Sequence, residues 1–260
     1  MRRSSLNGWT VFPSPNPNAR LRLFCFPYAG GGATIFATWP RALPPEVEVV
    51  AVQPPGREAR IAEKPYGDLG QLVDAMLPQL LPHFDRPFAF YGHSNGWLMA
   101  FELARTLRRT GGPMPRHLFV GGRPAPQVGR DEENIHALPH DEFLAALRRY
   151  AGTPEEILQN AEIMELIEPV LRADFSLGET YHWVPEPPLD LPISAFAGER
   201  DDEVTLDEVE AWREQTTGAF RLHVFPGDHF FINGDRAMVL QEISRDLRPL
   251  LQSLAPAHAW

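Results

Sequence analysis

The sequence predicts an α/β fold built on a mostly parallel sheet. Short, continuous apolar runs alternate with stretches that carry apolar residues at helical spacing, and each run is followed by Gly, Pro or polar residues. Continuous apolar runs are typical of strands buried on both faces, and strands alternating with helices are typical of βαβ units. The expected strands are 21–26, 47–52, 88–91, 117–120, 193–197 and 220–225.

Four stretches near these strands have the periodicity of helices. Residues 69–84 carry apolar side chains three and four positions apart, as a helix with one buried face requires. The other three expected helices are 97–107, 208–212 and 236–251. A chain of 260 residues suits one α/β domain with an insertion, so we expect a single domain over 1–260.

The insertion is expected at about residues 124–188, where no strand pattern occurs. Residues 141–150 predict a helix, residues 153–156 predict an N-cap, a first-turn proline and a capping-box glutamate, and residues 163–175 predict another helix. Such an insertion usually covers the carboxyl ends of the strands, where α/β sheets bind ligands. We therefore expect a helical lid, with a decorative subdomain as the alternative.

Composition excludes several classes of function. The chain has 24 Lys and Arg against 34 Asp and Glu, a net charge of −10, without a basic block, which disfavours nucleic acid and anionic membranes as partners. The single cysteine, Cys25, excludes an internal disulfide and multi-cysteine metal sites. No run approaches about 18 apolar residues, and Met1–Arg3 is not followed by an apolar signal segment. We expect a cytoplasmic protein without metal or organic cofactor.

A possible catalytic nucleophile lies in residues 91–96, which match the pattern G-x-S-x-G. An expected strand runs into this motif and an expected helix leaves it, as in the nucleophile elbow of α/β-hydrolases. Glycines flank the serine there because the turn is strained and crowded by neighbouring backbone. Ser94 is therefore the predicted nucleophile, and a glycine-rich turn with an idle serine is the alternative.

A serine hydroxyl needs a general base, and in this fold the acid and then the histidine follow the serine along the chain. Of nine histidines, His229 directly follows the last expected strand. Asp201 follows the preceding strand and would accept the Nδ1–H of this histidine. Asp202 and Glu203 are adjacent, so spacing alone leaves the choice of acid open.

Two backbone N–H groups are expected to bind the oxyanion of the reaction. One should belong to Asn95, the residue after the serine, and the other to the glycine-rich loop at 27–32. A dinucleotide-binding loop is the competing reading, but that motif requires glycine where this chain has Ile35.

Over most of its length the chain resembles the type II thioesterases, which are stand-alone α/β-hydrolases that accompany modular polyketide and nonribosomal peptide synthases. Many hydrolases share the elbow, whereas the P-G-R turn, the R-A-D-F segment of the insertion and the H-F-F sequence at 229–231 are much more specific together. The matching segments are 26–31, 53–57, 91–94, 138–144, 152–155, 171–175, 179–181, 198–201 and 227–231.

The resemblance implies hydrolysis of acyl thioesters on the phosphopantetheine arm of acyl or peptidyl carrier proteins, which clears stalled or wrongly primed units. By position it supports Ser94, Asp201 and His229 as the catalytic triad. It also implies that Ala29 and Asn95 supply the oxyanion N–H groups. A carboxylesterase or an acyltransferase with the same triad, and a non-catalytic binding protein with this fold, are the alternatives.

Two positions depart from the family pattern, which has methionine after the nucleophile and proline after the acid. This chain has Asn95 and Asp202 there. We expect the amide of Asn95 to face the site or the insertion, where it could alter acyl preference or hydrate the pocket. Four insertion residues are candidates for the acyl pocket, namely Met164, Ile167, Leu171 and Phe175. Candidates for a basic face toward an acidic carrier protein are Arg57, Arg60 and Lys64, or Arg123 and Arg130.

Overall fold

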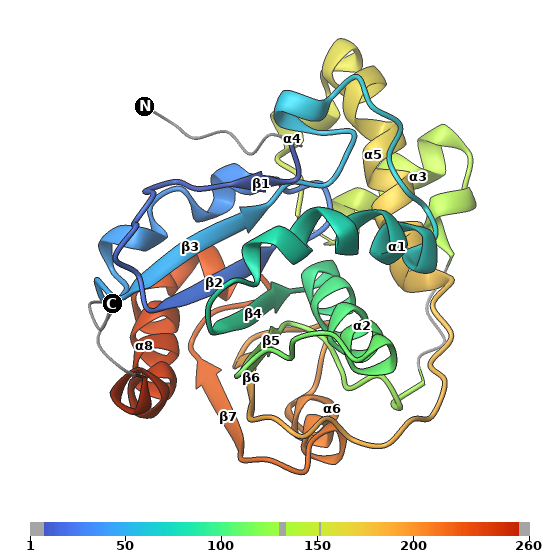
Figure 1. The fold of residues 1–260 in the computed structure, drawn as a ribbon. Coiled ribbons are helices and arrows are strands. Elements are labelled where there is room, and N and C mark those ends of the chain that lie inside the picture. Colours follow the sequence, from blue (N-terminus) through green and yellow to red (C-terminus); the bar gives the residue numbers. More distant parts are fainter. Residues whose placement is uncertain (1–7, 130–133, 151, 255–260) are drawn as a thin grey trace.

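The computed structural model describes residues 8–129, 134–150 and 152–254, which form a seven-stranded sheet with helices on both faces (Figure 1). The strand order is β1-β3-β2-β4-β5-β6-β7, and every neighbouring pair is parallel except β1 with β3. The expected fold class is thereby confirmed. The strands are β1 Thr10–Val11, β2 Leu21–Phe26, β3 Val47–Val52, β4 Phe88–His93, β5 Leu118–Gly121, β6 Ile193–Gly198 and β7 Phe220–Phe225.

The helices follow the predicted pattern with shifted ends, and β1 was missed because two residues carry no periodicity. The α-helices are α1 Leu69–Leu80, α2 Asn95–Thr110, α3 His140–Tyr150, α4 Glu155–Leu158, α5 Ala161–Glu179, α6 Leu206–Glu210, α7 Phe231–Gly234 and α8 Arg236–Ser253. Short 3₁₀ turns are Ala33–Phe36, Trp39–Arg41, Glu58–Arg60, Leu81–His83, Ile135–Ala137 and Ala211–Gln215.

The capping box expected at residues 153–156 was wrong. Helix α4 begins after Pro154, and no side chain caps it. A capping box does begin α6, where the Thr205 hydroxyl accepts from the Glu208 N–H and the Glu208 carboxylate accepts from the Thr205 N–H. The same sequence pattern therefore forms a cap only where the threonine directly precedes the helix.

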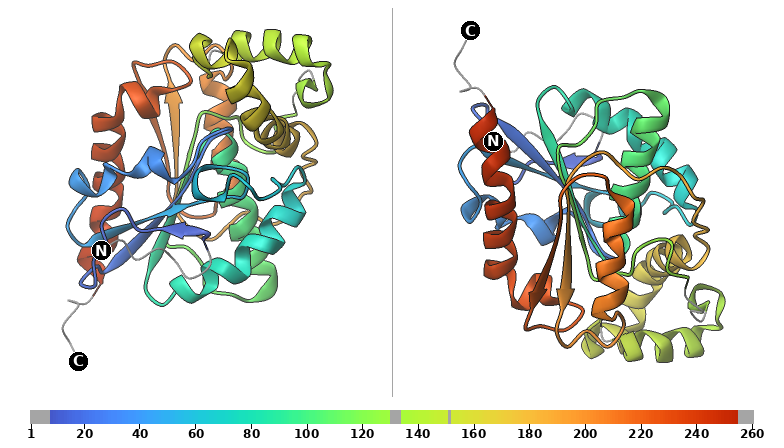
Figure 2. Two further views of the ribbon diagram at one scale, coloured as in Figure 1. Left: turned by 90° about the horizontal axis from the view of Figure 1, so that it is seen from above. Right: turned by 90° about the horizontal axis from the view of Figure 1, so that it is seen from below.

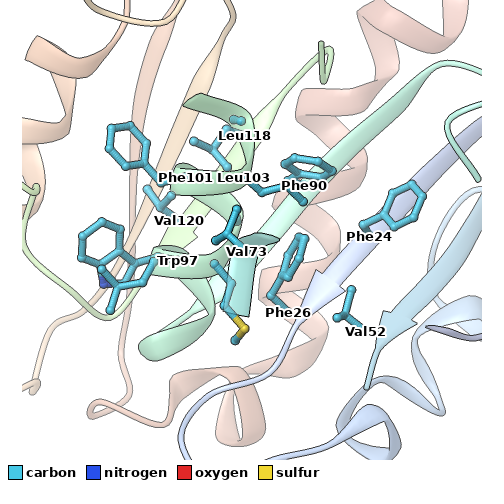
Figure 3. Packing of buried hydrophobic residues seen from close by; sticks show 14 of the residues in the cluster. Phe24, Phe26, Val52, Val73, Phe90, Trp97, Phe101, Leu103, Leu118 and Val120 are labelled. Atoms are coloured by element: carbon cyan, nitrogen blue, oxygen red, sulfur yellow. The ribbon is translucent and has the colours of Figure 1, made fainter. Parts of the chain in front are cut away.

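The sheet is covered on both faces, which explains its continuous apolar strands. Along β2, Phe24 and Phe26 point toward α1 and α2, whereas Leu23 and Cys25 point toward α8. Figure 2 shows the sheet nearly edge-on between these helices, and Figure 3 shows the packing on the α2 face. Strand β7 differs because it is an edge strand, and its Val224 is exposed.

The segment between β5 and β6 contains no strand among its described residues. Its helices α3, α4 and α5 lie beyond the carboxyl ends of the central strands, in the upper part of Figure 1. They have a small apolar core of their own. Its buried members are Ile135, Phe143, Ala146, Leu147, Leu158, Met164 and Leu171. This helical insertion thus lies at the end of the sheet where the predicted catalytic residues are.

The remaining expectations concern membrane spans, metal sites and residues that the structure does not describe. None of the helices in the described part of the chain is long and apolar enough to cross a membrane. Across those same residues, no group of three or more His, Cys, Asp and Glu side chains is arranged to hold a metal ion. Met1–Arg3 and Arg130, on which two sequence expectations rest, lie outside the described residues.

A buried polar network joins α8 to the opposite end of the sheet. Ser194 Oγ donates to Asp246 Oδ2 at 2.5 Å, and His223 Nε2 lies 2.8 Å from the same oxygen. His117 Nε2 lies 2.8 Å from Ser194 Oγ, and Arg221 also contacts the carboxylate. Burial raises the pKa of Asp246, but the hydrogen bonds from His223 and Ser194 outweigh burial and bring it to about 2. Ser194 is fully buried, so this Ser–His–Asp group braces the fold and meets no substrate.

We predict that Asp246→Asn lowers the free energy of unfolding by about 3 kcal/mol at neutral pH, because it removes the charge at the centre of this network. The folded pKa lies below the ordinary value of about 3.9, so the stabilisation exists above that pH and is lost as pH falls toward 2. Urea unfolding at several pH values checks this. The exposed Asp74→Asn in α1 is the control, expected within about 0.5 kcal/mol. An undiminished difference at pH 2.5 would contradict the prediction.

Candidate active site

Ser94 occupies the sharp turn between β4 and α2. Its backbone has φ +49° and ψ −128°, a conformation that costs energy for any residue other than glycine. Its N–H donates to the carbonyl of Gly121 at 2.8 Å, which ties the turn to the end of β5. Buried strands on both sides therefore keep the serine in a strained position at the carboxyl end of β4.

The two glycines of the motif are required by close backbone contacts. A Cβ atom on Gly92 would lie 2.2 Å from the carbonyl oxygen of Gly96. A Cβ on Gly96 would lie 2.2 Å from the carbonyl oxygen of Phe26, at the end of β2. Only glycine fits at either position, as the sequence pattern indicated.

The structure pairs His229 with Asp201. His229 Nδ1 lies 3.1 Å from Asp201 Oδ2, and the N–H of Glu203 donates to Asp201 Oδ1 at 2.9 Å. Asp202 is exposed, and the Glu203 carboxylate lies 3.8 Å from the same ring nitrogen. Burial raises the pKa of Asp201, but the hydrogen bond and charge of His229 outweigh it, so this pKa lies below its ordinary value. Of three adjacent acids, Asp201 is the one in hydrogen-bonding contact.

His93, the variable residue of the elbow, contacts the main chain of His229. It is fully buried, and its Nε2 lies 2.8 Å from the carbonyl oxygen of His229. Burial, and then the charge of His229, lower the pKa of His93 to about 3. The ring is therefore neutral at neutral pH, and Nε2–H donates to that carbonyl. Sequence reasoning missed this role because the contact joins residues 136 positions apart.

The two predicted oxyanion donors lie in the loop that follows β2 and in the elbow itself. The loop with Ala29 is a tight turn in which the Gly31 N–H donates to the Tyr28 carbonyl at 2.9 Å. Asn95 is the first residue of α2, where helix N–H groups lack partners within the helix. Neither the Ala29 N–H nor the Asn95 N–H donates to a protein acceptor among the residues that the structure describes. Both are available to a ligand.

The side chain of Asn95 points to the insertion. Its amide donates to the backbone carbonyl of Asp174 in α5. The sequence left open whether this polar residue faces the site or the insertion. Because the amide is buried and bonded to α5, it braces the insertion and does not hydrate the pocket.

Ser94 and His229 line one narrow cavity of about 50 Å³. Helix α3 supplies Leu147 and Tyr150 to its wall, which the sequence analysis did not single out. Their spacing of three residues on a predicted helix was the available signal. The other lining residues are Tyr28, Ala29, Arg123, Gly152, Thr153, Leu171, Phe175, Glu203 and Phe230.

Two of the four expected acyl-pocket residues lie elsewhere. Leu171 and Phe175 line the cavity at Ser94. Met164 and Ile167 instead pack within the core of the insertion, against Phe143 and its neighbours. Helical spacing identifies an apolar face, but it does not say whether that face packs on a cavity or on another helix.

The structure corrects one of the two expected basic faces, the one with Arg57, Arg60 and Lys64. Arg57 and Arg60 are buried and ion-paired, Arg57 with Asp174 at 2.8 Å and Arg60 with Glu63 at 2.6 Å. Neither guanidinium is presented to a partner. Lys64 is exposed on the same loop.

Comparison with known proteins identifies the family. Residues 21–247 match the model of the thioesterase domain. This chain belongs to the thioesterase family. The thioesterase is 45% identical over 248 residues to the gramicidin S biosynthesis protein GrsT of Aneurinibacillus migulanus, covering 95% of this chain and 97% of GrsT.

Solved structures agree with this assignment. The type II thioesterase BorB from the borrelidin biosynthetic cluster is 39% identical with a TM-score of 0.83, covering 92% of this chain and 97% of BorB. The RedJ thioesterase from the prodiginine pathway of Streptomyces coelicolor is 40% identical with a TM-score of 0.82, covering 95% and 100%. The type II thioesterase resemblance is confirmed, and the chain is a thioester hydrolase.

We predict that His93→Leu lowers the kcat of the thioesterase by about 10- to 100-fold, because the main chain of His229 loses its hydrogen-bond donor and shifts. KM should change little, since His93 does not line the cavity. His93→Gln, whose amide can reach the same carbonyl, should restore most of kcat. Steady-state kinetics with each folded variant check this, and equal kcat values for the two variants would contradict it.

Proposed function

We propose that this thioesterase hydrolyses acyl thioesters carried on the phosphopantetheine arms of acyl or peptidyl carrier proteins. In doing so it would remove aberrant or stalled acyl units from a modular polyketide or nonribosomal peptide synthase. The observation that carries the proposal is the cavity lined by both Ser94 and His229, with Asp201 bonded to Nδ1 of the imidazole. The relatives named above support carrier-protein partners, because their names place them in biosynthesis of such products.

In the first half of the reaction, Ser94 Oγ attacks the thioester carbonyl while His229 Nε2 takes the hydroxyl proton. The N–H groups of Ala29 and Asn95 bind the oxygen as it becomes negative. Asp201 accepts the Nδ1–H and stabilises the imidazolium. When the C–S bond breaks, the imidazolium gives its proton to the departing phosphopantetheine thiolate, which leaves an acyl-serine.

In the second half, His229 takes a proton from water, and the resulting hydroxide attacks the acyl-serine carbonyl. The same N–H groups bind the second oxyanion. Collapse breaks the C–O bond to Ser94, which regains its proton from His229, and the free acid leaves. A buried, neutral His93 suits this cycle, because a second charge beside His229 would oppose formation of the imidazolium.

The helical insertion acts as a lid in this proposal. A cavity of about 50 Å³ is far below the roughly 300–1,000 Å³ of ordinary ligand sites. An acyl group can therefore reach Ser94 only after part of the wall supplied by the insertion moves. A neighbouring cavity of about 400 Å³ shares Arg123 with the first, so a modest opening at this residue would join the two.

The use of cysteine bears on the compartment in which the enzyme acts. Carrier-protein synthases need their thiol arms reduced, and the one cysteine of this chain, Cys25, is buried and free. This use of cysteine suits a reducing compartment. We place the activity in the cytoplasm.

We predict that the wild type releases free acid from an acyl-carrier protein faster than from a matched oxygen ester, and that Ser94→Ala abolishes release. Mass spectrometry of the carrier protein measures it. Cleavage of the ester alone would indicate a carboxylesterase, and transfer of the acyl group to an added alcohol or amine would indicate an acyltransferase. No turnover by the folded wild type would indicate a binding protein.

We predict that Asp201→Asn lowers kcat by about 10²- to 10⁴-fold, because the amide no longer stabilises the required tautomer and imidazolium of His229. Asp202→Asn is the matched control on the adjacent, exposed residue, and its kcat should stay within about twofold of wild type. The same carrier-protein assay measures both. A larger loss at Asp202 would move the acid assignment to that residue.

A further inference from the structure

Asp174 in α5 is a buried acid that the proposed mechanism does not use. Its carboxylate is bonded on two sides. The N–H of Gly30 donates to Oδ2 at 2.7 Å, and the guanidinium of Arg57 donates to Oδ2 and Oδ1 at 2.8 and 2.9 Å. Only 5% of the residue is exposed. A side chain of the insertion therefore bonds the loop that carries Ala29, a predicted oxyanion donor.

These contacts fix the conformation of the oxyanion loop. Gly30 has φ +74° as the third residue of the turn closed by Gly31 and Tyr28, and such turns can change type by rotating their central peptide. Asp174 binds the N–H of that central peptide. Arg57 also donates to the carbonyl of Gly31 at 3.2 Å, so the ion pair contacts the turn at two consecutive residues. The Ala29 N–H lies within the segment that is held this way.

The same face of α5 contacts both the oxyanion loop and the elbow. Leu171 lies one turn before Asp174, and a Cβ on Gly30 would lie 2.7 Å from its Cδ2. The backbone carbonyl of Asp174 accepts from the side chain of Asn95, the other predicted oxyanion residue. One residue of the insertion thus contacts both halves of the oxyanion hole, the loop through its carboxylate and the elbow through its carbonyl.

We infer that Asp174 is a positioning residue through which α5 completes the oxyanion hole. The inference rests on the proposed function and adds that the hole belongs jointly to the sheet and to the insertion. If α5 left the loop, Gly30 would lose its acceptor and Arg57 would remain buried without its counter-charge. Admission of substrate must therefore leave this part of α5 in place. The movement that opens the cavity then belongs to α3 and to Gly152 and Thr153, the other residues of the insertion in its wall.

The test compares Asp174→Asn with the wild type in kcat, KM and inhibition by an alkyl trifluoromethyl ketone. Ser94 Oγ adds to the ketone carbon and its proton passes to His229, so the adduct places an oxyanion in the hole. We expect kcat to fall about 10- to 100-fold and the inhibition constant to rise in step, while KM stays within about threefold.

Glu168→Gln is the matched control, since Glu168 forms an ion pair with Arg172 at 2.7 Å on the same helix but does not contact the oxyanion loop. Its kcat and inhibition constant should stay within about twofold of wild type. Arg57→Lys is the second variant, which keeps the charge and loses the two-point contact. It should show the same pattern in milder form, and it decides the question if Asp174→Asn does not fold.

A rise in KM or a loss of thermal stability alone, with the ketone inhibition constant unchanged in both variants, would overturn the inference. Equal effects of Glu168→Gln and Asp174→Asn would also overturn it, because they would reflect the insertion in general. A different result would refute the proposed function. A wild type that binds the ketone at Ser94 but leaves acyl-carrier thioesters intact would refute that function, while the ketone comparison would still decide the role of Asp174.

Discussion

The close approach of three backbone segments at the nucleophile turn is the constraint on which the site depends. Gly92 lies against the carbonyl of Gly96, and Gly96 lies against the carbonyl of Phe26, so no Cβ fits at either glycine. This contact locks β4, α2 and the end of β2 together. Because the oxyanion loop continues directly from Phe26, the same contact places that loop beside Ser94. The strain at Ser94 persists because the buried strands around it leave no other conformation open.

The rigid sheet brings together residues that are far apart in the chain. Ser94 follows β4, Asp201 follows β6 and His229 follows β7, and parallel neighbours end at the same edge. Apolar packing covers both faces, and the Asp246 network braces β5, β6 and β7 at their other end. The distance between His229 and Asp201 therefore depends on the packing of the whole sheet as well as on the two loops, which are joined by the hydrogen bond from the Arg200 N–H to the Gly227 carbonyl at 3.0 Å.

The insertion is attached to this frame in a different way. It has its own apolar core, and a buried ion pair, Arg57 with Asp174, joins it to the loops of the sheet. Burying two charges costs desolvation energy, but their hydrogen bonds are directional and specify one docked position. Asn95 adds a further polar contact to the same segment. Apolar contacts alone would tolerate sliding, whereas these contacts define where α5 lies relative to Ser94.

The sequence by itself determined the features that depend on local pattern. Strand and helix alternation, the elbow and the order of Ser94, Asp201 and His229 follow from periodicity, from glycine at crowded turns and from family resemblance. Only the tertiary structure showed that Asp201 contacts His229, that Arg57 is buried against a partner 117 residues away, and that Met164 packs inside the insertion. A local pattern states that a side chain is apolar or charged. Which neighbour it meets depends on how distant elements pack, and that information is not local.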